Sequence, residues 1–194
     1  MPSSDSWTNK YSYLFQDNDY VRKLTERSVW DWKDYRIAAG ILRLADAGQG
    51  SPEFTKKFDE FDSVQKDHTF GFEIAHNLLQ YTYDDSGDWE LPELSRKRKE
   101  WCVDQVLGKL KEINDFDSEE GKRVLWKVSS IMSRTNTETT LSGEPETFVS
   151  EEDMKPVEDF LDSRPELRAK MEERVMEEIR KAKEAVEKQK NGQD

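Results

Sequence analysis

The sequence predicts an all-α fold, with an irregular five-helix core followed by a linker and a charged C-terminal helical arm. Apolar residues recur every three or four positions through most of the first 133 residues, which is the period of a helix. Strand-like alternation is limited to 11–13 and 80–83, and no hairpin turn joins two such runs. The core is expected to be either a bundle or a short α-solenoid.

The first predicted helix is the longest of the core and covers 18–47. The glycines that follow it, Gly48 and Gly50, are expected to stop it. A second helix over 51–66 has Ser51 as its N-cap, and a third over 70–83 is apolar around most of its circumference. The remaining two begin near Pro92 and at the capping residue Ser118.

Composition divides the chain near residue 134, because all six Trp and all six Tyr precede this point. Residues 1–133 are therefore predicted to be an aromatic-rich core domain, 134–149 a flexible linker, and 150–194 charged helices with a frayed end. A capping box at Ser163–Glu166 is expected to start the last helix, which runs to about Gln189.

The last helix carries an apolar stripe only one side chain wide, which predicts a docking or coiled-coil arm. Such a stripe needs a partner, which can be the core, a second copy or another protein. The stripe consists of Leu167, Met171, Val175, Ile179, Ala182 and Val186, of which Leu167, Met171, Val175 and Ile179 are the predicted partner-binding residues.

Charge and cysteine content exclude several classes of protein. The net charge of −12 favours solubility and disfavours nucleic-acid binding over the whole surface. The longest stretch without a charged residue, 74–83, is about half the length of a membrane span, so no membrane association is expected. One Cys and two His cannot build a closed zinc site, and the single Cys indicates a reducing, cytoplasmic location.

Glu73 and His76 form a Glu-x-x-His pair on one helix face, as in helical di-metal proteins. They are weak candidates for a metal site, because a second such pair is missing and the other histidine, His68, lies about 12 Å away along a helix. A polar pair at the edge of the core is the alternative. No cofactor is expected.

Cys102 is the only nucleophile that the sequence singles out, and it lies inside a predicted helix without a glycine turn. A cysteine in this position is usually a small buried side chain rather than a catalytic thiol. Phosphate-binding and hydrolase motifs are missing as well, so no catalytic residue is predicted.

The densest basic run consists of Arg96, Lys97, Arg98 and Lys99, with Trp101 close by. Basic side chains beside an aromatic ring can bind phosphate and stack a base, so these five residues are candidates for nucleic-acid or anion binding. Consecutive positions surround a helix, however, so at most two or three of them could face one ligand. The alternative is a solvated face that pairs with acidic residues.

Trp30 is a candidate anchor for a protein partner. In one continuous helix, Trp30 and Trp32 differ by about 200° in direction, so only one of them can face the core. The stripe that contains Tyr35 favours Trp32 as the buried residue, and Trp30 is then exposed on the opposite side. Helices packed on both sides would bury both.

These observations favour a non-catalytic α-helical adaptor or complex subunit that acts through protein contacts or self-association. The alternative is a small helical subunit of a nucleoprotein complex that uses the 96–99 run. A weaker alternative is a metal-dependent helical enzyme that uses Glu73 and His76.

Overall fold

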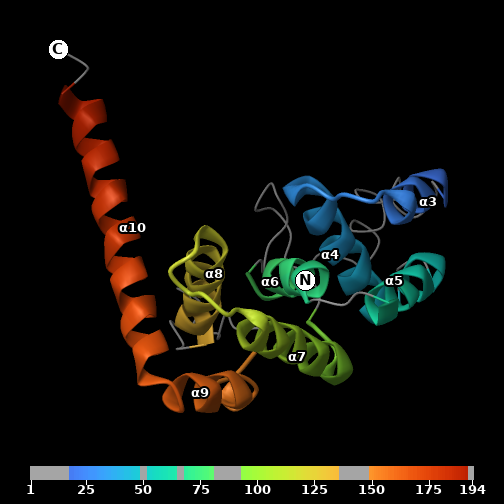
Figure 1. The fold of residues 1–194 in the computed structure, drawn as a ribbon. Helices are drawn as coiled ribbons and strands as arrows, with labels where there is room; N and C mark the ends of the chain where they lie inside the picture. Colours follow the sequence, from blue (N-terminus) through green and yellow to red (C-terminus); the bar gives the residue numbers. More distant parts are fainter. Residues whose placement is uncertain (1–17, 49–51, 65–67, 81–92, 136–148, 192–194) are drawn as a thin grey trace, which may run out of the picture.

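The computed structural model confirms the all-α class and describes residues 18–48, 52–64, 68–80, 93–135 and 149–191. These residues contain eight helices and no strand: α3 (Asn18–Glu26), α4 (Trp32–Asp46), α5 (Pro52–Val64), α6 (Thr69–Gln80), α7 (Arg96–Glu112), α8 (Glu119–Thr135), α9 (Lys155–Asp162) and α10 (Pro165–Asn191). α6 packs against α4, α7 and α8. α3 and α5 lie at one end of the molecule and α10 at the other (Figure 1).

The prediction of one helix over 18–47 is wrong, because the chain breaks between α3 and α4. Asp31 has extended backbone angles and caps α4, since its carboxylate accepts hydrogen bonds from the backbone N–H groups of Lys33 and Asp34. The Asp34 carboxylate accepts the backbone N–H of Asp31 in return, at 3.0 Å. This reciprocal capping box starts a new helix in a new direction.

Several predicted helix ends agree with the structure. Gly48 ends α4 with a φ of 76°, a left-handed conformation that glycine adopts without a steric penalty. Ser118 precedes α8, and its hydroxyl accepts the backbone N–H of Gly121 at 3.0 Å. The N-cap of α7 is Ser95, and the predicted start at Pro92 lies outside the described residues.

The segment after the predicted linker, most of which lies outside the described residues, joins the main core. Its buried apolar residues pack in the same cluster as those of α4 to α8. They are Val149, Met154, Val157, Leu161 and Leu167. Ion pairs to the body add to this contact, from Asp153 to Arg96 and from Lys170 to Asp117.

The predicted capping box at Ser163–Glu166 does not form. The Ser163 hydroxyl instead donates a 2.6 Å hydrogen bond to the Phe160 carbonyl, at the end of α9. α10 follows directly with Pro165 in its first turn, a position where proline fits because no intrahelical donor is lost. None of the described helices is both long and apolar enough to cross a membrane.

Candidate protein-interaction surfaces

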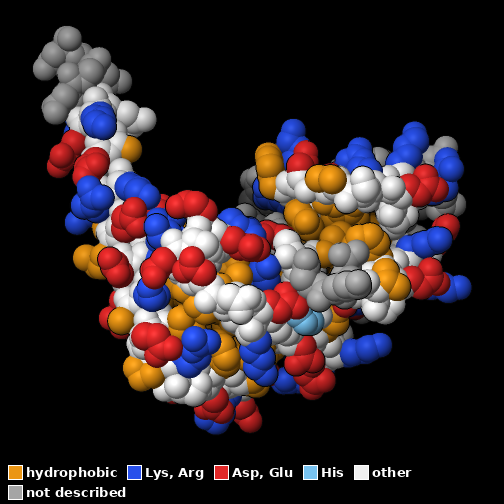
Figure 2. Space-filling model, in the orientation of Figure 1, with side chains coloured by type: hydrophobic (Ala, Val, Ile, Leu, Met, Phe, Trp, Pro, Cys, Tyr) orange, Lys and Arg blue, Asp and Glu red, His pale blue; other side chains and the backbone are white. Residues whose placement is uncertain are grey.

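The second half of α10 extends beyond the body of the molecule (Figure 1). The first half packs against α8 and α9, whereas every side chain from 179 to 190 is exposed. We call this exposed segment, residues 179–190, the distal arm. Figure 2 shows acidic and basic side chains along it, with hydrophobic side chains between them. A 12-residue helix segment is about 18 Å long, so the distal arm offers a sizeable surface.

The four stripe residues predicted to bind a partner differ in their accessibility. Leu167 is 1% exposed and belongs to the core, so it is not accessible to a partner, and Met171 and Val175 are partly buried. Ile179 is 41% exposed and begins the accessible part of the stripe. Two further apolar side chains of α10 are accessible: Val186 is 51% exposed, and Met176, just before the distal arm, is 64% exposed. Exposed apolar side chains at helical spacing are typical of surfaces that bind another helix or a groove.

A second exposed apolar surface lies at residues 28–33, between α3 and α4, and we call it the Trp32 corner. Val29 is 80% exposed and Trp32 is 66% exposed, with the Lys33 ammonium 5.6 Å from the Trp32 ring centre. Figure 2 shows hydrophobic side chains beside Lys and Arg along this edge of the molecule. Exposed tryptophan is enriched among residues that dominate binding energy at interfaces.

The predicted orientation of Trp30 and Trp32 is reversed in the structure. The Trp30 ring lies against Phe70 at 4.4 Å and Tyr35 at 5.6 Å, and its indole N–H donates a 2.9 Å hydrogen bond to the Leu24 carbonyl. Trp30 is therefore partly buried against the core and is not an exposed anchor. The break at 27–31 causes the reversal, because the angular relation of a continuous helix does not hold across it.

The basic run does not form one face. Arg96 pairs with Asp153, whereas the Arg98 guanidinium is nearly buried between Asp46, at 3.5 Å, and the Trp101 ring, at 5.1 Å. Trp101 also packs against Phe58, with the two ring centres 5.5 Å apart, so its ring is not an open stacking platform. Arg96 and Lys97 are exposed, whereas Arg98 and Lys99 are partly buried. Nucleic-acid binding by this run stays a prediction.

Glu73 and His76 do not come together with further ligands. The Glu73 carboxylate is 9% exposed and pairs with Arg123 and with Lys127, whose Nζ lies 2.5 Å away. Cations on both oxygens compete with a metal ion for the same carboxylate. Among the described residues, no group of three or more His, Cys, Asp or Glu side chains could hold a metal ion.

Cys102 is completely buried in α7, and this burial raises the pKa of its thiol to about 12. A thiol of this kind is protonated at neutral pH and is a poor nucleophile. We expect the native protein not to react with a thiol reagent at pH 8, and the unfolded chain to react fully. A time course of labelling with and without denaturant measures this. Rapid labelling of the native chain would contradict the buried position.

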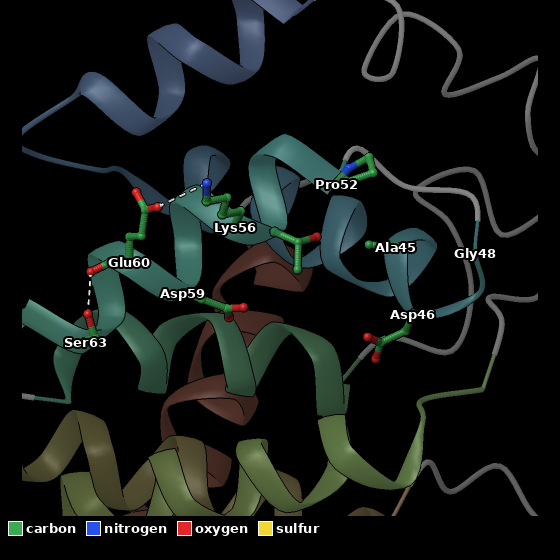
Figure 3. A pocket seen from close by; sticks show the side chains of 9 residues that line it. Ala45, Asp46, Gly48, Pro52, Lys56, Asp59, Glu60 and Ser63 are labelled. Atoms are coloured by element: carbon green, nitrogen blue, oxygen red, sulfur yellow. Dashed lines mark hydrogen bonds and ion pairs between the residues drawn. The ribbon is translucent and has the colours of Figure 1, made fainter.

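A groove of about 750 Å³ lies where the end of α4 meets α5 (Figure 3). Several of its polar side chains pair with one another or with the body. Lys56 lies 4.0 Å from Glu60, and Asp46 pairs with Arg98. The described residues of its lining include neither His nor Cys, and the groove does not assemble a nucleophile with a base. The lining residues are Ala45, Asp46, Gly48, Pro52, Thr55, Lys56, Asp59, Glu60 and Ser63.

Among the described residues, the distal arm and the Trp32 corner are thus two places where large apolar side chains are exposed close together. The sequence pointed to the first through its stripe and to the second through Trp30, but it chose the wrong tryptophan of that segment as the exposed one. The Asp31–Asp34 capping box was a readable signal for the helix break that reverses the two. Comparison with protein-family models, curated proteins and solved structures finds no match to this chain.

Proposed function

We propose that this protein is a non-catalytic helical adaptor or complex subunit that docks onto a protein partner through the distal arm. The observation that carries the proposal is that α10 continues for twelve exposed residues beyond its own packing partners, with Ile179 and Val186 on its surface. Isolated helical segments of this length are marginal in water, so a partner that covers the apolar stripe would stabilise the arm.

The Trp32 corner supports the adaptor role. The distal arm and the Trp32 corner lie on opposite sides of the helical body (Figure 1). A protein that bridges two partners needs two separate surfaces, and the rigid core between them would fix their relative positions. The Trp32 corner is therefore assigned to a second contact, in which the indole ring is the anchor.

The test compares two double variants of the full chain. Ile179→Asn with Val186→Asn removes the apolar stripe, and we expect loss of the partners that the wild-type protein captures from cells after crosslinking. Thermal unfolding should barely change, because both side chains are exposed and surface substitutions usually alter stability by less than about 0.5 kcal/mol.

The matched control is Glu184→Gln with Lys188→Gln, on the opposite face of the same helix. It keeps the net charge and should leave capture unchanged. Identical partner sets for the wild-type protein and the stripe variant would contradict the proposed role of the distal arm. Loss of capture in both double variants would point to general damage to α10 instead.

A further inference from the structure

The distal arm is basic, although the whole protein is acidic. Residues 179–190 contain five Lys or Arg and two Glu, a local charge of +3 in a chain of net charge −12. Lys183 lies beside the stripe, four positions after Ile179, and Lys190 has the same relation to Val186. Cations at these positions meet the rim of whatever groove receives the stripe.

From this geometry we infer that the distal arm docks into an apolar groove rimmed by Asp and Glu on a different protein. Ile179, Ala182 and Val186 enter the groove, and Lys183 and Lys190 pair with its acidic rim. This inference rests on the proposed function and adds the chemistry of the partner. Complementary charge would both orient the helix and speed its association.

A parallel second copy does not fit the stripe. The face of α10 that carries Leu167, Met171 and Val175 is already engaged by the body, where α10 packs against α8 and α9. Two parallel helices cross at about 20° and stay close over their length, so the second copy would run into the space that α8 occupies.

An antiparallel second copy avoids that collision but is disfavoured by charge. The centre of such a pair falls near residue 184 when Ala182 of each copy lies opposite Val186 of the other. The two Lys183 side chains then flank the same seam and face each other, and like charges at such positions are destabilising. Two arms of +3 each also repel as a whole.

Lipid and nucleic acid fit the distal arm less well than a protein groove does. Helices that lie on membranes carry Trp, Phe or Leu on their apolar face, and this stripe consists of Ile, Ala and Val. Glu184 and Glu187 interrupt the basic residues, which weakens contact with a row of phosphates.

The experiment uses two designed helical peptides as probes. Both carry Leu at their a and d positions, and they differ only in having Glu or Lys at e and g. We expect the full chain to bind the Glu peptide about tenfold more tightly than the Lys peptide, with affinity that falls as salt rises. Fluorescence anisotropy of the labelled peptides measures both.

Charge reversal on the arm tests the assignment of the rim. Lys183→Glu with Lys190→Glu should weaken binding of the Glu peptide about tenfold and remove the preference over the Lys peptide. The matched control, Lys181→Glu with Lys188→Glu, makes the same change on the opposite face and should alter binding by less than about twofold.

Equal binding of both peptides would overturn the acidic-rim assignment. A dimer in analytical ultracentrifugation that Ile179→Asn abolishes would overturn it as well. Binding to phosphatidylserine vesicles or duplex DNA that is tighter than binding to the Glu peptide, and that depends on Lys183, would also overturn it. If the stripe variant loses its captured partners while the peptides are not distinguished, the proposed docking function stands and the chemistry of the groove is wrong. If capture is unchanged, the docking function itself fails.

Discussion

Replacing Glu73 with Ala is expected to lower the free energy of unfolding by about 2–4 kcal/mol, because it leaves two cations without their shared partner. The Glu73 carboxylate connects α6 to Arg123 and Lys127 on α8. Arg123 is 39% and Lys127 22% exposed, so water compensates part of the loss. Urea denaturation at pH 7 measures the change.

The Glu73→Gln variant separates charge from shape. Burial alone would raise the pKa of the Glu73 carboxyl, but hydrogen bonds from Lys127 and Arg123 outweigh it and hold that pKa below its ordinary value of 4.5. The ionised carboxylate therefore stabilises the fold fully above pH 4.5, and this contribution is lost as the pH falls through the lowered pKa. We expect the stability gap between wild type and Glu73→Gln to be largest near pH 7 and to narrow below pH 4.5. A gap that widens in acid would contradict the ion-pair assignment.

Glu73 shows why local sequence patterns miss long-range ion pairs. The pattern Glu-x-x-His is consistent with a metal ligand because both residues share a helix face. The cations that pair with Glu73 lie 50 and 54 residues further along the chain, where nothing local marks them as its partners. Only the packing of α8 against α6 brings them together.

Helix periodicity was sufficient to predict most of the helices, but it failed to predict the break between α3 and α4. The buried faces of α5, α6 and α8 follow from their apolar spacing, which depends on neighbours three or four residues apart. The same rule treated 18–47 as one helix, since Trp32 and Tyr35 fit the spacing. The competing signal was Asp31 with Asp34, and the reciprocal cap that they form starts α4 five residues after α3 has ended.

The C-terminal stripe illustrates a limit of a different kind. Leu167 and Ile179 both belong to the predicted stripe, but the first is in the core and the second is in solvent. The difference arises because α8 and α9 cover only the first half of α10. The extent of that cover depends on how the whole body packs, so the spacing of the stripe predicts the face but not the point where exposure begins.

The second large effect is expected at Phe58, where truncation to Ala should cost about 3–5 kcal/mol of unfolding free energy. Phe58 is 1% exposed, and its ring centre lies 5.3 Å from that of Phe70 and 5.5 Å from that of Trp101. It therefore joins α5 to both α6 and α7. The loss combines the buried area with the cavity that remains among rings that cannot close in.

Two controls fix the interpretation of the Phe58 result. Phe58→Leu keeps most of the volume and should cost well under half as much. Trp32→Ala removes an even larger aromatic side chain, but Trp32 is 66% exposed, so we expect a change of less than about 0.5 kcal/mol in urea denaturation. A large loss of stability in Trp32→Ala would mean that Trp32 packs within the fold, and the Trp32 corner would then not be an interaction surface. A small loss, together with weaker partner capture, is the combination expected of a residue kept on the surface for binding.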